Sequence, residues 1–308
     1  MVKSNTTGGV RMRNLVKSFL FVLMLFISPS FLWSQDALPV VAALDHGIHV
    51  IDSLARYGEI QDTLPFPQSP VIPRTFQQTK ENEIADTLGV LAPFWEKVRQ
   101  IRRKKSGNIL RVLHVGDSHI RGHILPRTTG DSLQLAVGRL TYTDMGINGA
   151  TCETFSTPER ISSIRAEHPD LLILSFGTNE SHNRGYNALR HYQQMDVFVR
   201  MLRTAMPGVP ILMTTPPGSY QGRRRAYSLN PRTAIAVQTI HRFAADNGIA
   251  VWDMFNIGGG GRRACLNWQS AKMMRPDRVH YTVEGYTFQG QLLYQAIVKA
   301  YNDYVGYR

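Results

Sequence analysis

Residues 171–177 read LLILSFG, and this apolar run decides the fold class. A short run of branched and aromatic side chains that ends in Gly-Thr-Asn is typical of a strand buried on both faces. Comparable runs occur at 109–115 (ILRVLHV), 140–147 (LTYTDMGI), 210–215 (PILMTT) and 249–255 (IAVWDMF). The sequence therefore predicts five buried strands.

The segments between these strands predict helices. They comprise residues 132–138, 157–168, 187–206, 231–248 and 283–305, and several open or close on residues that favour helix ends, such as Thr-Pro or Gly. Strands that alternate with helices indicate a parallel sheet with helices on both faces, a three-layer α/β/α architecture. Ligand sites in such sheets form at the carboxyl ends of the strands, so functional residues are sought there.

The first 37 residues read as an export signal. Lys3, Arg11, Arg13 and Lys17 precede the apolar run at 18–33, and small or polar residues at 34–37 offer cleavage positions. Because the run is short and contains a proline, a cleaved signal peptide fits better than an uncleaved anchor. We therefore expect a periplasmic or secreted protein.

Residues 38–107 carry weaker signals. The stretch DTLPFPQSPVIPRTF (62–76) is Pro-rich and reads as an extended linker, and residues 81–92 allow a short helical piece. Pro93 suits the start of a helix, and Phe94, Val98 and Ile101 give this helix an apolar face. We expect a linker and a helix that packs on the domain at 108–308.

Four short segments carry the residue types of an acyl-transfer site. They are GDSH (116–119), GINGAT (146–151), GTNE (177–180) and DRVH (277–280), and the first three follow strands. A serine hydroxyl becomes a nucleophile when a histidine takes its proton, and a carboxylate orients that histidine. Ser118, His280 and Asp277 are the candidates for these three roles.

The tetrahedral intermediate of acyl transfer also needs hydrogen-bond donors for its oxyanion. Backbone N–H groups in glycine-rich turns can approach closely, so the N–H groups of Ser118 and Gly149 are candidates. The side-chain amide of Asn179 offers a third donor. Each segment alone is equally compatible with an ordinary turn, and only their joint occurrence favours a catalytic site.

In this order and spacing, the four segments resemble the SGNH or GDSL hydrolase superfamily, over about residues 108–305. The resemblance implies a flavodoxin-like fold, a hydrolase of esters or thioesters, and no cofactor. It places the family's Ser, Gly, Asn and His at Ser118, Gly149, Asn179 and His280, with Asp277 three residues before the His. Glu180 departs from the family's usual Asp.

A narrower likeness is to bacterial peptidoglycan and other carbohydrate O-acetylesterases. It rests on His119 after the nucleophile, on GGGGRRACLNW (258–268) and on DRVHYTVEGY (277–286). His119 either polarises a substrate or bonds to a neighbouring loop, and the second interpretation is favoured. His182 either lines the mouth of the site or belongs to a solvated loop.

Two basic clusters offer a further hypothesis about substrate binding. One contains Arg223 and the two arginines after it, and the other contains Arg262 and Arg263. If the clusters converge, they form a cationic rim that suits a carboxylate-bearing glycan. Trp268 could stack on the sugar rings of that glycan. The alternative is solvated loop charge.

Cysteine content and net charge further limit the kinds of site and partner that the sequence predicts. Cys152 and Cys265 are the only cysteines, so one disulfide or two free buried thiols are both possible. Neither has a nearby ligand at metal-site spacing, so no metal site is predicted. The formal charge of +12 favours acidic partners or an anionic envelope surface, and no nucleic-acid-binding motif accompanies it.

The leading functional hypothesis is an O-acetylesterase acting on a cell-envelope or other polysaccharide through an acyl-enzyme on Ser118. A lipase or thioesterase for longer acyl chains is the first alternative. The second is a non-catalytic glycan-binding protein of the same fold. The sequence leaves the oligomeric state open.

Overall fold

The computed structural model describes residues 62–65, 70–223 and 226–306. At the centre of this part of the chain lies a six-stranded sheet. The strand order is β1-β8-β5-β4-β2-β3. The strands are β1 (Ile84–Ala85), β2 (Leu110–Gly116), β3 (Leu140–Gly146), β4 (Leu171–Ser175), β5 (Ile211–Thr214) and β8 (Ala250–Trp252). Strands β2, β3, β4, β5 and β8 pair in parallel, which agrees with the flavodoxin-like fold that the resemblance implied.

The prediction of five strands falls one strand short. Residues 84–85, expected within a helical piece, form β1, which pairs antiparallel with β8. The side chain of Asn82, just before β1, accepts a hydrogen bond from Trp252 Nε1 at 2.9 Å. A two-residue strand carries too little sequence pattern to be recognised, but it covers the edge that β8 would otherwise expose.

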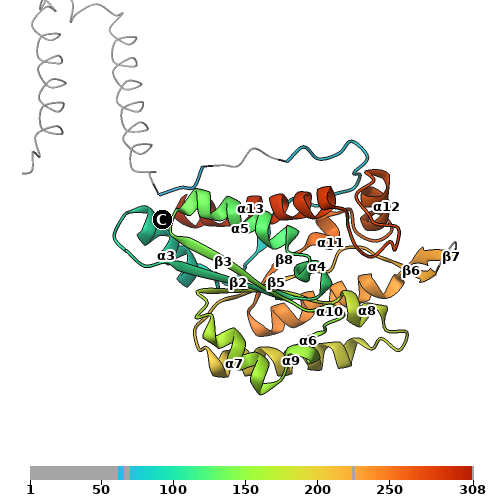
Figure 1. The fold of residues 1–308 in the computed structure, drawn as a ribbon, viewed down its shortest axis with the longest axis horizontal. Coiled ribbons are helices and arrows are strands. Elements are labelled where there is room, and N and C mark those ends of the chain that lie inside the picture. Colours follow the sequence, from blue (N-terminus) through green and yellow to red (C-terminus); the bar gives the residue numbers. More distant parts are fainter. Residues whose placement is uncertain (1–61, 66–69, 224–225, 307–308) are drawn as a thin grey trace, which may run out of the picture. The chain divides into compact units, whose positions relative to one another are not determined.

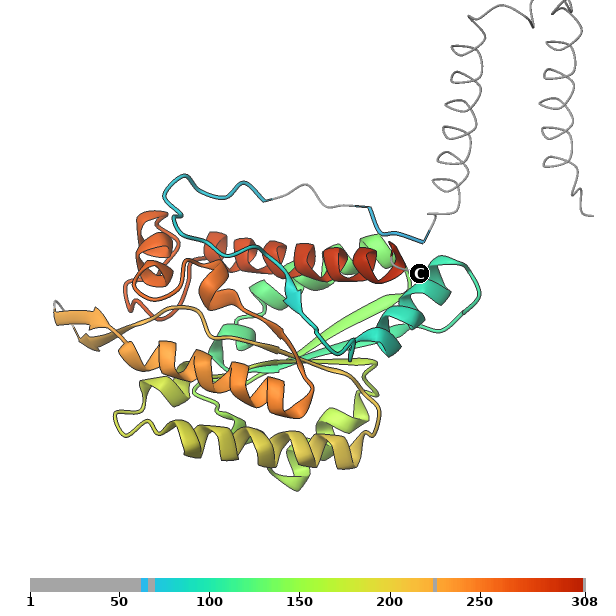
Figure 2. The same cartoon turned by 180° about the vertical axis from the view of Figure 1, so that it is seen from behind.

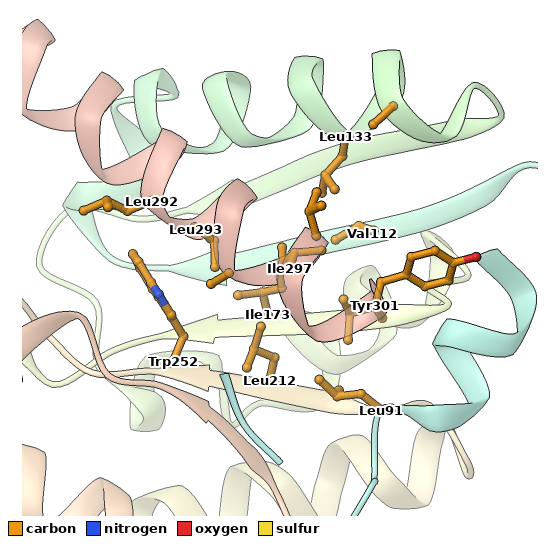
Figure 3. Close-up of a cluster of buried hydrophobic side chains, with 14 of the residues drawn as sticks. Leu91, Val112, Leu133, Ile173, Leu212, Trp252, Leu292, Leu293, Ile297 and Tyr301 are labelled. Carbon is orange, nitrogen blue, oxygen red and sulfur yellow. The ribbon is translucent and has the colours of Figure 1, made fainter. Parts of the chain in front are cut away.

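Helices cover both faces of the sheet (Figure 1). One face carries α3 (Ala92–Arg102), α5 (Ile124–Val137) and α13 (Val283–Gly306), and the other carries α7 (Pro158–Ala166), α9 (Ala188–Ala205) and α10 (Pro231–Asn247). Alternate strand residues supply the two cores: Ile173 packs on the α13 side, whereas Leu172 and Leu174 pack on the α9 side. Figure 3 shows Leu293 and Ile297 of α13 above the sheet residues Ile173 and Leu212.

The α13 face also receives the segment before β2. Helix α3 has Pro93 in its first turn and buries Phe94, Val98 and Ile101, as predicted. Phe76 packs edge-on against Trp268 with ring centroids 4.9 Å apart. Residues 70–107 are thus bound to the sheet domain by side-chain packing rather than solely by chain connection.

Shorter elements gather where the parallel strands end. They are α4 (Ser118–Arg121), α6 (Cys152–Phe155), α8 (Thr178–His182), α11 (Met254–Ile257), α12 (Arg263–Ser270) and a hairpin of β6 (Tyr220–Arg223) and β7 (Ala226–Leu229). The hairpin was not anticipated. Seen from behind, it projects from the end of the domain that carries α12 (Figure 2).

The signal-peptide prediction for residues 1–37 lies outside the described residues, as do residues 38–61 and 66–69 of the N-terminal segment predicted at 38–107. Within the described ranges, no helix is both long enough and apolar enough to cross a bilayer.

Candidate active site

Ser118 is the first residue of α4, directly after strand β2. The side chain of Asp117 caps this helix by accepting a hydrogen bond from the His119 N–H at 2.9 Å. Gly146, at the end of the neighbouring strand β3, lies against the backbone of Arg121. A Cβ at position 146 would collide with that backbone. The tight turn therefore fixes the position of the serine at the edge of the sheet.

A chain of hydrogen bonds joins Ser118, His280 and Asp277. The distance between Ser118 Oγ and His280 Nε2 is 2.9 Å. On the other side of the ring, His280 Nδ1 lies 3.0 Å from Asp277 Oδ2. Residues from opposite ends of the domain sequence therefore meet in the arrangement that the sequence analysis predicted.

The loop that carries His280 is folded back on itself. Met274 and Tyr281 form an isolated antiparallel bridge, and the Arg275 N–H donates to the His280 carbonyl at 2.9 Å. Tyr281 is fully buried and donates its hydroxyl to the Gly218 carbonyl at 2.8 Å. These contacts fix the backbone beneath the imidazole.

Hydrogen bonds hold Asp277 ionised. Burial acts to raise the pKa of its carboxyl, but N–H groups of Val279 and His280 and the His280 ring bond to it, and the pKa is lowered overall. An ionised Asp277 fixes a proton on Nδ1 of His280, which leaves Nε2 free to accept the proton of Ser118.

The candidate oxyanion donors lie on the next two loops. The Ile147 N–H donates to the Gly116 carbonyl at 3.1 Å, which joins the loop after β3 to the nucleophile turn. Gly149 has a φ of 74°, a left-handed conformation that favours glycine. Asn179 donates from Nδ2 to the Ala150 carbonyl at 2.9 Å and, at 3.4 Å, to Asp117 Oδ2. The three loops thus form one connected network.

Glu180, the departure from the family pattern, completes this network. Its carboxylate accepts the Gly177 N–H at 2.9 Å and the Cys152 N–H at 3.0 Å. The side chain therefore ties the loop after β4 to the loop after β3. Burial raises its pKa, and hydrogen bonds from the backbone N–H groups of Cys152, Glu180 and Gly177 and from the Cys152 thiol counteract this effect in part.

Burial also changes the protonation of the groups beneath Ser118. It raises the pKa of Asp117 to about 8, against the hydrogen bond from His119 N–H. It lowers the pKa of His119 to about 3, so that this imidazole is neutral. Asp117 is thus a buried hydrogen-bond partner of the turn.

The assignment of His119 to substrate binding is not supported. Its side chain is 5% exposed, its Nδ1 lies 2.9 Å from the Tyr286 hydroxyl, and its ring stands 5.3 Å from that of His280. His119 therefore packs behind the catalytic base candidate, which agrees with the structural interpretation.

The expectation that Trp268 stacks on sugar rings is wrong. The side chain has no exposed surface and is enclosed by Phe76, Tyr281 and Phe288, with ring centroids 4.9–5.7 Å away. The sequence pattern could not reveal this burial because the enclosing rings come from distant segments. Trp268 supports the loop of His280 through Tyr281.

The remaining substrate-binding candidates are scattered. His182 is half-buried and hydrogen-bonds through Nε2 to Ser219 Oγ at 3.0 Å, so its ring is anchored to the segment before β6. Arg262 is exposed just before α12. Arg223 ends β6, and the two arginines after it lie outside the described residues, so the cationic rim remains a hypothesis.

The two cysteines are both free and buried, so the possible disulfide is not formed. Cys152 begins α6, and Cys265 lies within α12. Burial raises the pKa of the Cys265 thiol to about 12, which makes it unreactive. Within the described ranges, no group of three His, Cys, Asp or Glu residues could hold a metal ion.

Arg278 is a residue of the site that sequence reasoning missed. Its guanidinium lies over the rings of Tyr227 and Tyr220, 4.7 and 5.3 Å from their centroids. Its carbonyl accepts the Tyr220 N–H at 3.0 Å, and its φ is 58°. Arg278 therefore joins the β6–β7 hairpin to the loop of Asp277 and His280.

The fold and the hydrogen-bonded chain of Ser118, His280 and Asp277 define the class of a serine hydrolase with a flavodoxin-like sheet. A sequence model of the GDSL-like Lipase/Acylhydrolase family matches residues 115–288. The chain belongs to this family and is an SGNH-type serine hydrolase.

Comparison with solved structures supports the fold. A structure described as "Peptidoglycan O-acetylesterase in action" has a TM-score of 0.64 at 17% identity, and the match covers 71% of this chain and 99% of the other. The acetyl xylan esterase AlAXEase has a TM-score of 0.50 at 17% identity, over 61% and 100% of the two chains. A search of curated proteins gave no match.

Proposed function

We propose that this hydrolase is an exported O-acetylesterase that removes acetyl groups from a polysaccharide of the cell envelope, such as peptidoglycan. The observation that carries the proposal is the 2.9 Å contact between Ser118 Oγ and His280 Nε2, with Asp277 behind the ring. The resemblance in fold to a peptidoglycan O-acetylesterase and to an acetyl xylan esterase supports the choice of an acetylated glycan.

In the proposed reaction, Ser118 Oγ bonds to the acetyl carbon while its proton passes to His280 Nε2. The carbonyl oxygen becomes an oxyanion, which the N–H groups of Ser118 and Gly149 and the Asn179 amide stabilise. One N–H of the Asn179 amide makes only a long contact, at 3.4 Å, with Asp117 Oδ2. This N–H is therefore the one that is available to the oxyanion.

Collapse of the intermediate breaks the bond between the acetyl carbon and the sugar oxygen, and His280 returns the proton to that oxygen. Water then attacks the acetyl-enzyme, again with His280 as base, and acetate leaves. Each proton that the base accepts is given back, so the cycle needs no cofactor.

The test is release of acetate from O-acetylated peptidoglycan and from acetylated xylan by purified protein. Release from peptidoglycan at a higher kcat/KM is the expected result, and Ser118→Ala should abolish it. A fluorophosphonate should label Ser118 in the wild-type enzyme. Absence of both labelling and turnover would instead indicate a non-catalytic glycan-binding protein.

A series of p-nitrophenyl esters from acetyl to decanoyl separates this proposal from a lipase or thioesterase. Activity should fall steeply beyond the shortest chains. A maximum at octanoyl or decanoyl esters would contradict the acetylesterase proposal and favour the acyl-chain alternative.

A further inference from the structure

A polar pocket adjoins the candidate oxyanion hole. Its walls include Thr151 and Asn179, which follow β3 and β4, and residues at the start of α9. The pocket encloses about 490 Å³ of space not filled by atoms, part of it open to solvent. The part of this space that a water-sized molecule can occupy is about 120 Å³, so the pocket is a shallow hollow that can hold one face of a sugar ring rather than a whole small molecule.

Glu153, Glu180 and Arg190 are the charged side chains of the pocket lining, so the lining carries no excess of positive charge. Arg190 Nη2 lies 3.8 Å from Glu153 Oε2, so the two opposite charges offset each other. Gln194 Nε2 donates to the same Glu153 oxygen at 2.7 Å. A wall of amide, guanidinium and carboxylate groups offers donors and acceptors together, which suits hydroxyl-bearing ligands and disfavours an acyl chain.

A buried histidine supplies an unused hydrogen-bonding group in the same wall. His191 lines the pocket, is 2% exposed, and bonds through Nδ1 to the Tyr186 hydroxyl at 3.0 Å. Its Nε2 is itself buried and has no hydrogen-bond partner among the described residues. A buried polar atom left unpaired costs about 1–3 kcal/mol, so a ligand that pairs with it gains binding energy.

The state of this histidine fits an uncharged ligand. Burial lowers the pKa of His191 to about 4, so the ring is neutral at neutral pH. In either tautomer, Nε2 can pair with a hydroxyl, because a hydroxyl both donates and accepts. The site therefore provides no unbalanced positive charge that would select a carboxylate or phosphate.

We propose that this pocket is a subsite for an uncharged sugar residue of the glycan, next to the residue whose acetyl group reaches Ser118. The two sites share Asn179, so one polysaccharide chain can occupy both. This inference rests on the proposed function and adds to it a neutral sugar ring as the recognised neighbour of the acetylated one.

The experiment compares Gln194→Leu with Gln193→Leu in the full-length enzyme. Gln194 lines the pocket, whereas Gln193 is an exposed residue of the same helix that does not. Substrates are p-nitrophenyl acetate, which has no sugar, and O-acetylated chitopentaose, which consists of neutral sugars.

Gln194→Leu should raise KM for O-acetylated chitopentaose about fivefold or more, which is the effect of losing about one hydrogen bond. Its kcat and its kinetics on p-nitrophenyl acetate should stay within twofold of wild type. Gln193→Leu should change neither substrate. Equal KM for the sugar substrate in wild type and Gln194→Leu would overturn the subsite.

Failure of the proposed function can be told apart from failure of the subsite. If wild type cleaves p-nitrophenyl acetate but not the acetylated sugar, the O-acetylesterase proposal fails. Calorimetric binding of unacetylated chitopentaose to Ser118→Ala then decides the subsite. Binding that Gln194→Leu weakens supports it, whereas no binding, or binding that Gln194→Leu leaves unchanged, overturns it.

Discussion

The carboxylate of Glu180 accepts the backbone N–H of Cys152 at 3.0 Å, although the two residues belong to loops after different strands. The same carboxylate accepts the Gly177 N–H at 2.9 Å. One buried side chain thus holds the loop of Gly149 against the loop of Asn179. The alignment of the candidate oxyanion donors therefore depends on this side chain.

Replacing Glu180 by Gln should lower both stability and turnover. An amide presents N–H groups where the carboxylate accepts, so one backbone donor loses its partner at a cost of about 1–3 kcal/mol. We expect kcat on p-nitrophenyl acetate to fall at least tenfold because the donors lose their alignment. Urea unfolding and kinetics measure both effects, and unchanged values in both would show that Glu180 does not align this network.

Replacing Asp277 by Asn should reduce kcat by about 10⁴ with little change in KM. An asparagine can place its donor toward Nδ1 and so favour the tautomer of His280 that cannot take the proton of Ser118. Asp131→Asn, at an exposed position on α5, is the matched control and should keep full activity. A kcat loss below tenfold in Asp277→Asn would mean that another group orients the base.

Replacing Arg278 by Ala should lower kcat severalfold. The guanidinium over Tyr220 and Tyr227 contributes about 0.5–2 kcal/mol to holding the loop of His280 against the hairpin. Arg275→Ala removes an exposed arginine from the same loop and should have no such effect. The pH profile of kcat/KM should change in Arg278→Ala if the loop orients His280, and an unaltered profile would limit Arg278 to a structural role.

Replacing Trp268 by Ala should destabilise the domain by about 3–5 kcal/mol, because a fully buried aromatic side chain leaves a large cavity. KM for a glycan substrate should stay the same in the fraction that remains folded. A selective rise in KM without loss of stability would restore the sugar-stacking interpretation that the structure contradicts.

His114 makes the stability of the domain depend on pH. It is fully buried between the Tyr142 hydroxyl and Ser175 Oγ, and burial lowers its pKa from 6.5 to about 3. Below pH 6.5, the His114 imidazole is therefore protonated in the unfolded chain but stays neutral in the folded chain. Stability is full above that pH and falls as the pH drops toward 3.

The measurement is urea unfolding at pH 7.5 and pH 5.0 in wild type and in His114→Gln. His114 should account for about 2 kcal/mol of the wild-type loss between these two pH values. The difference between the two proteins cancels the contributions of all other groups. An identical pH dependence in both would mean that His114 is protonated in the folded state.

Much of the fold was predictable because it depends on local pattern. Continuous apolar runs such as 171–177 can be satisfied only by strands covered on both faces, and the helices between them follow from the 3.6-residue period. The triad residues were found because their residue types and their order along the chain match a known family. Strand β1 and the β6–β7 hairpin escaped notice because each is too short to carry a period.

What the sequence by itself determined is the set of chemical groups: a hydroxyl and amide donors at the ends of buried strands, and an imidazole and a carboxylate just before the last helix. Only the tertiary structure decided which side chains are accessible. Trp268 and His119 are enclosed by Phe76, Tyr286 and other rings from distant segments, whereas Tyr186, Arg190 and Gln194 open onto a pocket beside Asn179. Burial depends on contacts between residues far apart in the chain, and no local pattern encodes those contacts.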